Sequence, residues 1–229
     1  MFYDSTYILV LIGAVICLFA SMNVKSTYSK YSKMITSRRI TSQQAAEAIL
    51  QAAGIYDVRI ERIRGDLTDH YSPGEKVLRL SDTVYGSTSV AAIGVAAHEC
   101  GHAIQHNVGY TPLKLRSVSV PVANFGSMLS WPLILIGLVL GSTGLAKFGV
   151  ILFLFVVFFQ IITLPVEFNA SRRALKVLGE RNLLAGNERI GAKKVLSAAA
   201  MTYVAAVFSS ILQLLRLVLL VQGTGRRRR

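Results

Sequence analysis

Cysteine is scarce in this chain of 229 residues, which contains only Cys17 and Cys100. The first lies within a long apolar run and the second within a separate helical segment, so a disulfide bond between them is implausible. The sequence therefore excludes a disulfide-stabilised scaffold and fits a reducing compartment. It also has no internal repeat and no low-complexity segment, which excludes a repeat architecture.

Acidic residues are scarce too, since 12 aspartates and glutamates stand against 25 lysines and arginines, for a net charge of +13. Such an excess can indicate nucleic-acid binding, but the sequence lacks the aromatic and basic pattern of those surfaces. Hydrophobic residues make up 52% of the chain, and its mean hydropathy of +0.49 exceeds the usual range for a soluble domain. We therefore expect a lipid bilayer as partner, and no nucleic acid.

Four apolar stretches are long enough to cross a bilayer: residues 5–24, 117–140, 145–164 and 195–222. Asp4 precedes the first stretch and basic residues follow it, the reverse of the order in a cleaved signal peptide. We predict an uncleaved anchor with its N-terminus outside. The fourth stretch contains an arginine, so it either spans the membrane or lies partly along its surface.

Basic residues are concentrated in the polar segments that flank the two middle stretches, which predicts a cytoplasmic location for both segments. We therefore expect a multi-pass membrane protein. The predicted division is an anchor (residues 1–24), a cytoplasmic portion with the first polar segment (25–116), a transmembrane hairpin (117–164), a cytoplasmic basic segment (165–194) and a C-terminal apolar helix with a basic tail (195–229).

The first cytoplasmic portion shows patterns of helices and short strands. Thr41 and Gln44 form a capping box that predicts the start of a helix. Alternation near residue 60 and again over residues 77–81 predicts two strands. Serine N-caps then predict a helix over about residues 89–107. An exposed edge strand before this helix could hold an extended peptide by main-chain pairing.

This last helix carries the motif His98-Glu99-Cys100-Gly101-His102. Two histidines four residues apart lie on one face of a helix, so both imidazoles can reach one metal ion. The glutamate after the first histidine then lies beside the ion, where it can take a proton from a metal-bound water. The motif predicts a catalytic zinc site with Glu99 as the base.

A catalytic zinc site needs a third protein ligand and one position for water. The candidates are Glu167, His106, Cys100, His70 or another acidic residue. Glu167 is favoured because an apolar helix is expected to end before Pro165, so that a new helix carries this carboxylate on the same side of the membrane as the motif. The alternatives have simpler interpretations, since His106 is rotated away from the first histidine, Cys100 points to another side of the helix, and His70 is expected in a turn.

The two zinc motifs, His98-Glu99-x-x-His102 and the segment Glu-Phe-Asn-Ala-Ser-Arg-Arg-Ala that opens at Glu167, resemble the membrane-bound neutral zinc metallopeptidases of the YugP type. Residues 69–81 are similar to that family's edge-strand segment. The resemblance implies a gluzincin arrangement, with His98, His102 and Glu167 as ligands of one zinc ion and Glu99 as catalytic base. The implied fold is a mainly α membrane protein (α+β), with about four transmembrane helices and a small peptidase domain that carries a short edge-strand sheet.

Two positions near Glu167 depart from related patterns. Asn169 stands where the family pattern has an aspartate, and Ser171 stands where heat-shock membrane proteases and prenyl-protein proteases carry an acid. The hydrogen bonds around the ligands must therefore differ from those of the wider relatives. The group that stabilises the oxyanion is left open among His106, Arg172, Arg173 and a tyrosine.

These expectations predict a zinc-dependent, membrane-embedded endopeptidase whose substrates are membrane or membrane-proximal polypeptides. We expect it in the bacterial plasma membrane, with residues 25–116 as its peptidase portion and its active site facing the cytoplasm. Zinc lowers the pKa of a bound water toward ~7, and Glu99 would take up its proton during attack on a peptide carbonyl. The alternative is a non-proteolytic membrane scaffold or adaptor with a structural zinc, closed by Cys100 or His106 as fourth ligand. The sequence indicates neither the natural substrate nor the oligomeric state.

Overall fold

The computed structural model describes residues 5–226, with side chains up to Gly223. The topology prediction uses Asp4, which lies outside the described residues. The side chains of the basic C-terminal tail lie outside them too. The chain is mainly helical with a small sheet, which confirms the predicted fold class. Its elements are α1 (Tyr7–Ser32), α2 (Ser42–Ala52), β1 (Arg59–Ile63), β2 (His70–Ser72), β3 (Val77–Ser81), α3 (Val90–Asn107), α4 (Thr111–Val139), α5 (Thr143–Glu180) and α6 (Gly186–Arg226).

Four of the helices, α1, α4, α5 and α6, are long and apolar enough to cross a membrane, as predicted. The predicted break before Pro165 is wrong, because α5 continues through this proline to Glu180. Proline fixes φ near its helical value and removes only one backbone donor, so a long helix with apolar surroundings can accommodate it. Glu167 therefore lies in the same helix as the apolar stretch that precedes it.

The contacts divide the chain into two compact units. The first, here called the helical unit, comprises α1 up to Ser21, residues 114–164 of α4 and α5, and α6 from Thr202. The second, here called the site unit, comprises residues 22–113 and 165–201. Each unit combines parts of several of the five predicted segments, so these contacts do not test the predicted five-part division, which stays a prediction.

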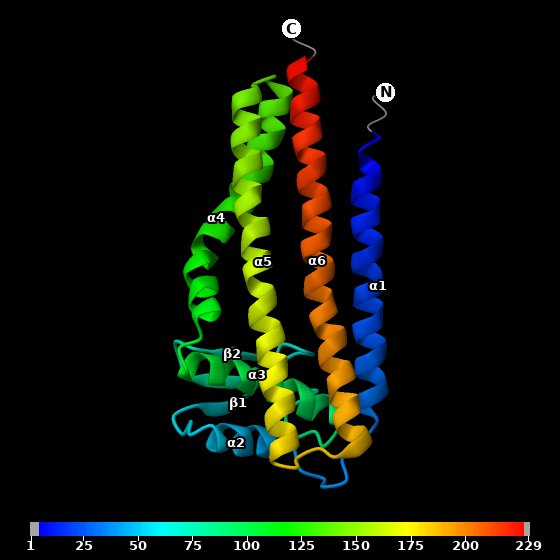
Figure 1. Cartoon of the computed structure of the whole chain (residues 1–229), viewed down its shortest axis with the longest axis vertical. Helices are drawn as coiled ribbons and strands as arrows, with labels where there is room; N and C mark the ends of the chain where they lie inside the picture. Colours follow the sequence, from blue (N-terminus) through cyan, green and yellow to red (C-terminus); the bar gives the residue numbers. More distant parts are fainter. Residues whose placement is uncertain (1–4, 227–229) are drawn as a thin grey trace. The chain divides into compact units, whose positions relative to one another are not determined.

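Small residues allow the helices of the helical unit to pack closely. A Cβ at Gly137 of α4 would lie 2.5 Å from the backbone nitrogen of Ala146 in α5, and one at Gly13 of α1 would lie 2.6 Å from Oγ of Ser209 in α6. Helices in a bilayer associate through such close packing, because lipid is as apolar as their side chains. Figure 1 shows α4 and α5 joined by a tight turn.

The sheet of the site unit has the strand order β1-β3-β2, with β1 parallel and β2 antiparallel to β3. The strands near residue 60 and over 77–81 are confirmed as β1 and β3. However, β3 is the central strand, and the edge next to it is the short β2, in which His70 is paired with Arg79 instead of lying in the predicted turn. Four of the five residues of β3 are buried, as expected for a central strand.

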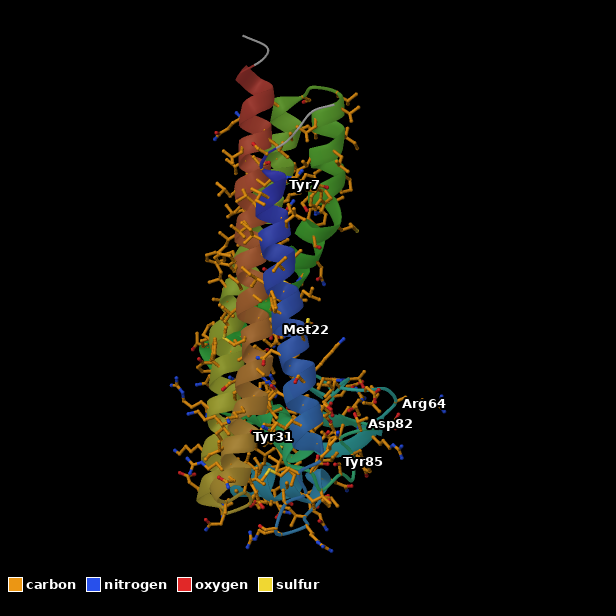
Figure 2. All side chains as sticks on the ribbon, turned by 90° about the vertical axis from the view of Figure 1, so that its right-hand side faces the viewer. Tyr7, Met22, Tyr31, Arg64, Asp82 and Tyr85 are labelled. Atoms are coloured by element: carbon orange, nitrogen blue, oxygen red, sulfur yellow. The ribbon has the colours of Figure 1, made fainter. Side chains whose placement is uncertain are left out.

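Helices α2 and α3 pack against each other and against the strands of the sheet (Figure 1). The predicted capping box of Thr41 and Gln44 opens α2, and Ser89 caps α3 by accepting a hydrogen bond from the backbone of Ala92. Away from this core, Asp82 accepts hydrogen bonds from Arg62 and from the backbone of Gly65. These bonds hold the loop that carries Arg64 at the outer tip of the site unit (Figure 2).

Helix α3 is buried on nearly all sides, because α2, the sheet, α5 and α6 contribute to one core around it. Its two glycines predict a close approach of another backbone, since each glycine costs about 1 kcal/mol in a helix. The prediction is confirmed for Gly101, where a Cβ would lie 2.5 Å from the carbonyl oxygen of Ala170 in α5. At Gly94 the backbone of Ala192 in α6 also approaches, but a Cβ would meet it at an ordinary 3.6 Å, so the packing there does not require a glycine.

These two glycines form a matched pair for testing the packing of α3. We expect Gly101→Ala to lower the free energy of unfolding by roughly 1–3 kcal/mol, because α3 and α5 must move apart. Gly94→Ala should be neutral or stabilise by up to about 1 kcal/mol, because it removes a helical glycine without a clash. Thermal unfolding of the detergent-solubilised protein measures both. Equal destabilisation by the two substitutions would contradict the predicted close contact.

Candidate metal centre

The two histidines of the motif lie side by side on α3. Because they are four residues apart, His98 and His102 project from one face, with ring centroids 4.8 Å apart and ring planes at 86°. Both side chains are largely buried, at 16% and 12% exposure. The pair therefore presents two nitrogen donors toward one point in a mostly water-excluded environment.

Glu167 approaches this pair from α5. Its Oε2 lies 3.3 Å from Nε2 of His98 and 3.6 Å from Nε2 of His102, and its side chain is 3% exposed. The ligand atoms that the three residues offer all lie within 4.8 Å of one another. Two ligands about 2.1 Å from a tetrahedral zinc ion lie about 3.4 Å apart, so both carboxylate distances fit such a centre.

Each imidazole makes a hydrogen bond through its Nδ1, and its Nε2 faces Glu167. Nδ1 of His102 lies 3.0 Å from Oε1 of Gln105, and Nδ1 of His98 lies 3.0 Å from Oγ of Ser171. An amide oxygen only accepts, so Nδ1 of His102 donates and the lone pair of its Nε2 is available to a cation. Such outer contacts fix the orientation of metal-binding histidines.

Gln105 is itself held by two further acceptors and is completely buried. Its Nε2 donates to the carbonyl oxygen of Val166 at 2.8 Å and to Oδ1 of Asn169 at 3.1 Å. The same Oδ1 accepts a 2.7 Å bond from Nε of Arg173. These bonds fix which end of the Gln105 amide faces His102.

Glu99 is buried beside the histidines, with 9% exposure. Its Oε2 accepts a 3.1 Å hydrogen bond from the backbone N–H of Tyr71 in β2. Burial raises the pKa of the Glu99 carboxyl, and the neighbouring charges of His98 and His102 only partly oppose this shift. The carboxyl group of Glu99 is thus poised to hold a proton more readily than an exposed glutamate.

The other candidate ligands lie elsewhere. Nδ1 of His106 makes a 2.9 Å hydrogen bond with Oη of Tyr71, Cys100 is buried with its thiol toward the carbonyl oxygen of Ala46, and His70 contacts the carbonyl oxygen of Thr68. In residues 5–223, His98, His102 and Glu167 are the one group of three potential ligands that are close enough to share an ion.

The remaining predicted residues differ in how close they come to the ligands. Asn169 is in the hydrogen-bond chain that reaches His102, and Arg173 contacts Asn169 while its guanidinium lies over the ring of Tyr110. Arg172 is exposed on another face of α5. Sequence reasoning missed Gln105, although its position three residues after His102 places both on one helix face.

Comparison with known proteins supports the resemblance seen in the sequence. The family model described as "Putative neutral zinc metallopeptidase" matches residues 6–222. The chain is also 50% identical over 201 residues to the "Putative membrane protease YugP" of Bacillus subtilis (strain 168), covering 88% of this chain and 89% of that protein. No solved structure gives a significant match.

The ligand role of Glu167 can be tested with a substitution that keeps its size. We expect Glu167→Gln to weaken zinc binding by more than the roughly 10–100-fold that loss of an outer hydrogen bond costs. Metal analysis of the purified protein and competition with a chelator measure this loss. Glu180→Gln, an exposed substitution in the same helix, should retain wild-type zinc content. Unchanged zinc affinity in Glu167→Gln would remove this residue from the centre.

The contact between Ser171 and His98 gives a second prediction. Ser171→Ala should weaken zinc binding by roughly tenfold, because the imidazole loses the partner that fixes its orientation. Ser197→Ala, at an exposed serine of α6, is the matched control and should leave zinc affinity unchanged. If both variants bind zinc like the wild type in the chelator competition, the Ser171 hydroxyl does not orient the ligand.

Proposed function

The chain belongs to the family described as "Putative neutral zinc metallopeptidase", and we propose that it is a zinc endopeptidase of the membrane that cleaves membrane or membrane-proximal polypeptides. The observation that carries this proposal is the approach of Glu167 from α5 to within 3.6 Å of the imidazoles of His98 and His102. Two imidazoles and a carboxylate are a ligand set of catalytic zinc sites in peptidases. One catalytic ion, held by these three residues, is part of the proposal.

Glu99 is proposed as the general base and acid. A zinc ion held at this centre would activate water and polarise a peptide carbonyl. The carboxylate of Glu99 would accept the proton of the attacking water and return it to the leaving nitrogen. The hydrogen bond from the backbone N–H of Tyr71 to its Oε2 holds the Glu99 carboxylate in place beside the histidines.

The edge strand β2 borders the catalytic group. The N–H of Tyr71 is directed away from β3 and donates to Glu99, so the edge of β2 that does not face β3 lies next to the proposed base. An extended peptide can pair with such an edge through its main chain, with little dependence on its sequence. We propose that a polypeptide substrate binds along β2.

The same strand supplies a candidate for oxyanion stabilisation. The hydroxyl group of Tyr71 and the ring of His106 are hydrogen-bonded to each other, and the backbone of Tyr71 already contacts Glu99. Arg173 is engaged by Asn169, and Arg172 is exposed on another face of α5. Of the predicted donors, the Tyr71–His106 pair is therefore the one we favour.

The alternative of a scaffold with a structural zinc requires a fourth protein ligand. Both predicted candidates are engaged in other contacts, Cys100 with Ala46 and His106 with Tyr71. The arrangement favours a catalytic centre. Since the basic segments flank the apolar spans, we also propose that this centre faces the cytoplasm.

Substitution of the proposed base separates metal binding from catalysis. We expect Glu99→Gln to retain zinc while peptide cleavage falls by roughly 10²–10⁴-fold, because the amide cannot accept the proton. The assay is cleavage of an unfolded protein by the pure, zinc-loaded enzyme in detergent, with a chelator-treated sample as zero. Glu47→Gln, in the exposed part of α2, is the control and should cleave like the wild type. Wild-type cleavage by zinc-loaded Glu99→Gln would end the proposed mechanism.

A further inference from the structure

A groove of about 980 Å³ lies in the site unit between α5 and α6. It is formed by the α5 face that runs from Phe168 to Glu180 and the α6 face that runs from Arg189 to Met201. Its volume is at the upper end of the range of about 300–1,000 Å³ that ligand sites occupy. The groove is large enough for a molecule of ligand size, and neither the zinc ion nor a peptide on β2 would occupy it.

One end of the groove is apolar. Phe168 and Met201 line it with 43% and 50% exposure, together with Ala200. Phe168 follows the apolar stretch of α5 by four residues, and Met201 directly precedes the part of α6 that belongs to the helical unit. Along the sequence of both helices, therefore, this apolar end is the one nearer to the most apolar part of each helix.

The rest of the groove is strongly basic. Arg172, Lys176, Arg189 and Lys193 line it, and the single acidic residue among the lining groups is Glu180. Glu180 pairs with Lys176 at 3.7 Å. Within the part of the chain that the structure describes, the other three cations have no carboxylate within ion-pair distance.

Helix C-termini attract cations, and this accounts for part of the charge. The guanidinium of Arg189 lies so close to Gly179 that a Cβ there would be 3.0 Å from its Nη1, one residue before α5 ends. The negative end of the α5 dipole favours a cation at that place. Arg172 and Lys193 lie one or more turns away from the helix end, so the dipole does not explain them.

We infer that this groove binds one anionic phospholipid, with the phosphate between the basic residues and the glycerol and acyl chains toward Phe168 and Met201. A basic pocket between helices, next to the bilayer, is the arrangement in which anionic headgroups bind. A free anion would leave the apolar end unused, and an acidic peptide would place its charges against it. The inference does not depend on the proposed peptidase function, because it concerns lipid binding alone.

The test compares two double substitutions that remove the same charge. Arg189→Gln with Lys193→Gln removes two cations that line the groove, whereas Arg181→Gln with Lys194→Gln removes two exposed cations next to them that do not. The full chain in neutral detergent is titrated with dihexanoyl phosphatidylglycerol, dihexanoyl phosphatidylcholine, inorganic phosphate or a hexaglutamate peptide. Native mass spectrometry counts bound molecules and gives the apparent affinity.

We expect the wild type to bind one phosphatidylglycerol saturably, and much more tightly than phosphatidylcholine or phosphate. The groove variant should bind it roughly tenfold more weakly, and the control variant should change by less than a factor of two. Lys193→Gln against Lys194→Gln repeats the comparison with single substitutions if the double variant does not fold.

Four results would overturn the inference. Equal weakening in both double variants would indicate diffuse surface charge. Equal binding of phosphatidylcholine would indicate an apolar groove without headgroup recognition. Equal binding of inorganic phosphate, or tighter binding of a hexaglutamate peptide, would indicate an anion or peptide site instead of a lipid site.

Discussion

The contact between Gly101 and the carbonyl oxygen of Ala170 is the constraint on which the candidate metal centre depends. Even one methyl group at position 101 would lie 2.5 Å from that oxygen, so α3 and α5 could not approach as closely. Metal and catalytic groups must be held within about 0.5 Å of their working geometry. Because Gly101 lies between the two histidines and Ala170 lies three residues after Glu167, this contact sets the distance between the imidazoles and the carboxylate.

The polar groups behind the ligands form a satisfied network inside an otherwise apolar core. Gln105 is fully buried, yet its amide oxygen faces His102 and its nitrogen has two acceptors, one of them Asn169. A buried polar group without partners costs about 1–3 kcal/mol, whereas a complete network makes the side chains rigid. Ser171 acts in the same way on His98. At position 171, where the wider relatives carry an acid, this chain uses a neutral hydroxyl for the contact with His98.

Local patterns made much of this structure predictable. The capping box of Thr41 and Gln44, the Ser89 cap and the spacing of the two histidines depend on neighbours along the chain, and the structure has each as predicted. The failures concern features that tertiary contacts decide. The strand β2 has only three residues and forms through pairing with β3. Pro165 signals a helix end in a soluble protein, but the long apolar helix α5 continues through it. The sequence favours Glu167 over the other candidate ligands, but only the packing of α5 on α3 brings its carboxylate to the two histidines.

Within the site unit, two faces of helix α5 have different contacts. Ala170 and Ala174 are fully buried toward α3, at the helical spacing that continues from Glu167, while Phe168 and Arg172 point into the groove beside α6. Ser171 belongs to both faces, because it lines the groove and also contacts His98. A helix cannot rotate one face without the other, since its side chains are fixed at 3.6 residues per turn. Any change in the groove that turns α5 must therefore also move the hydroxyl that orients His98 and the carboxylate that faces both imidazoles.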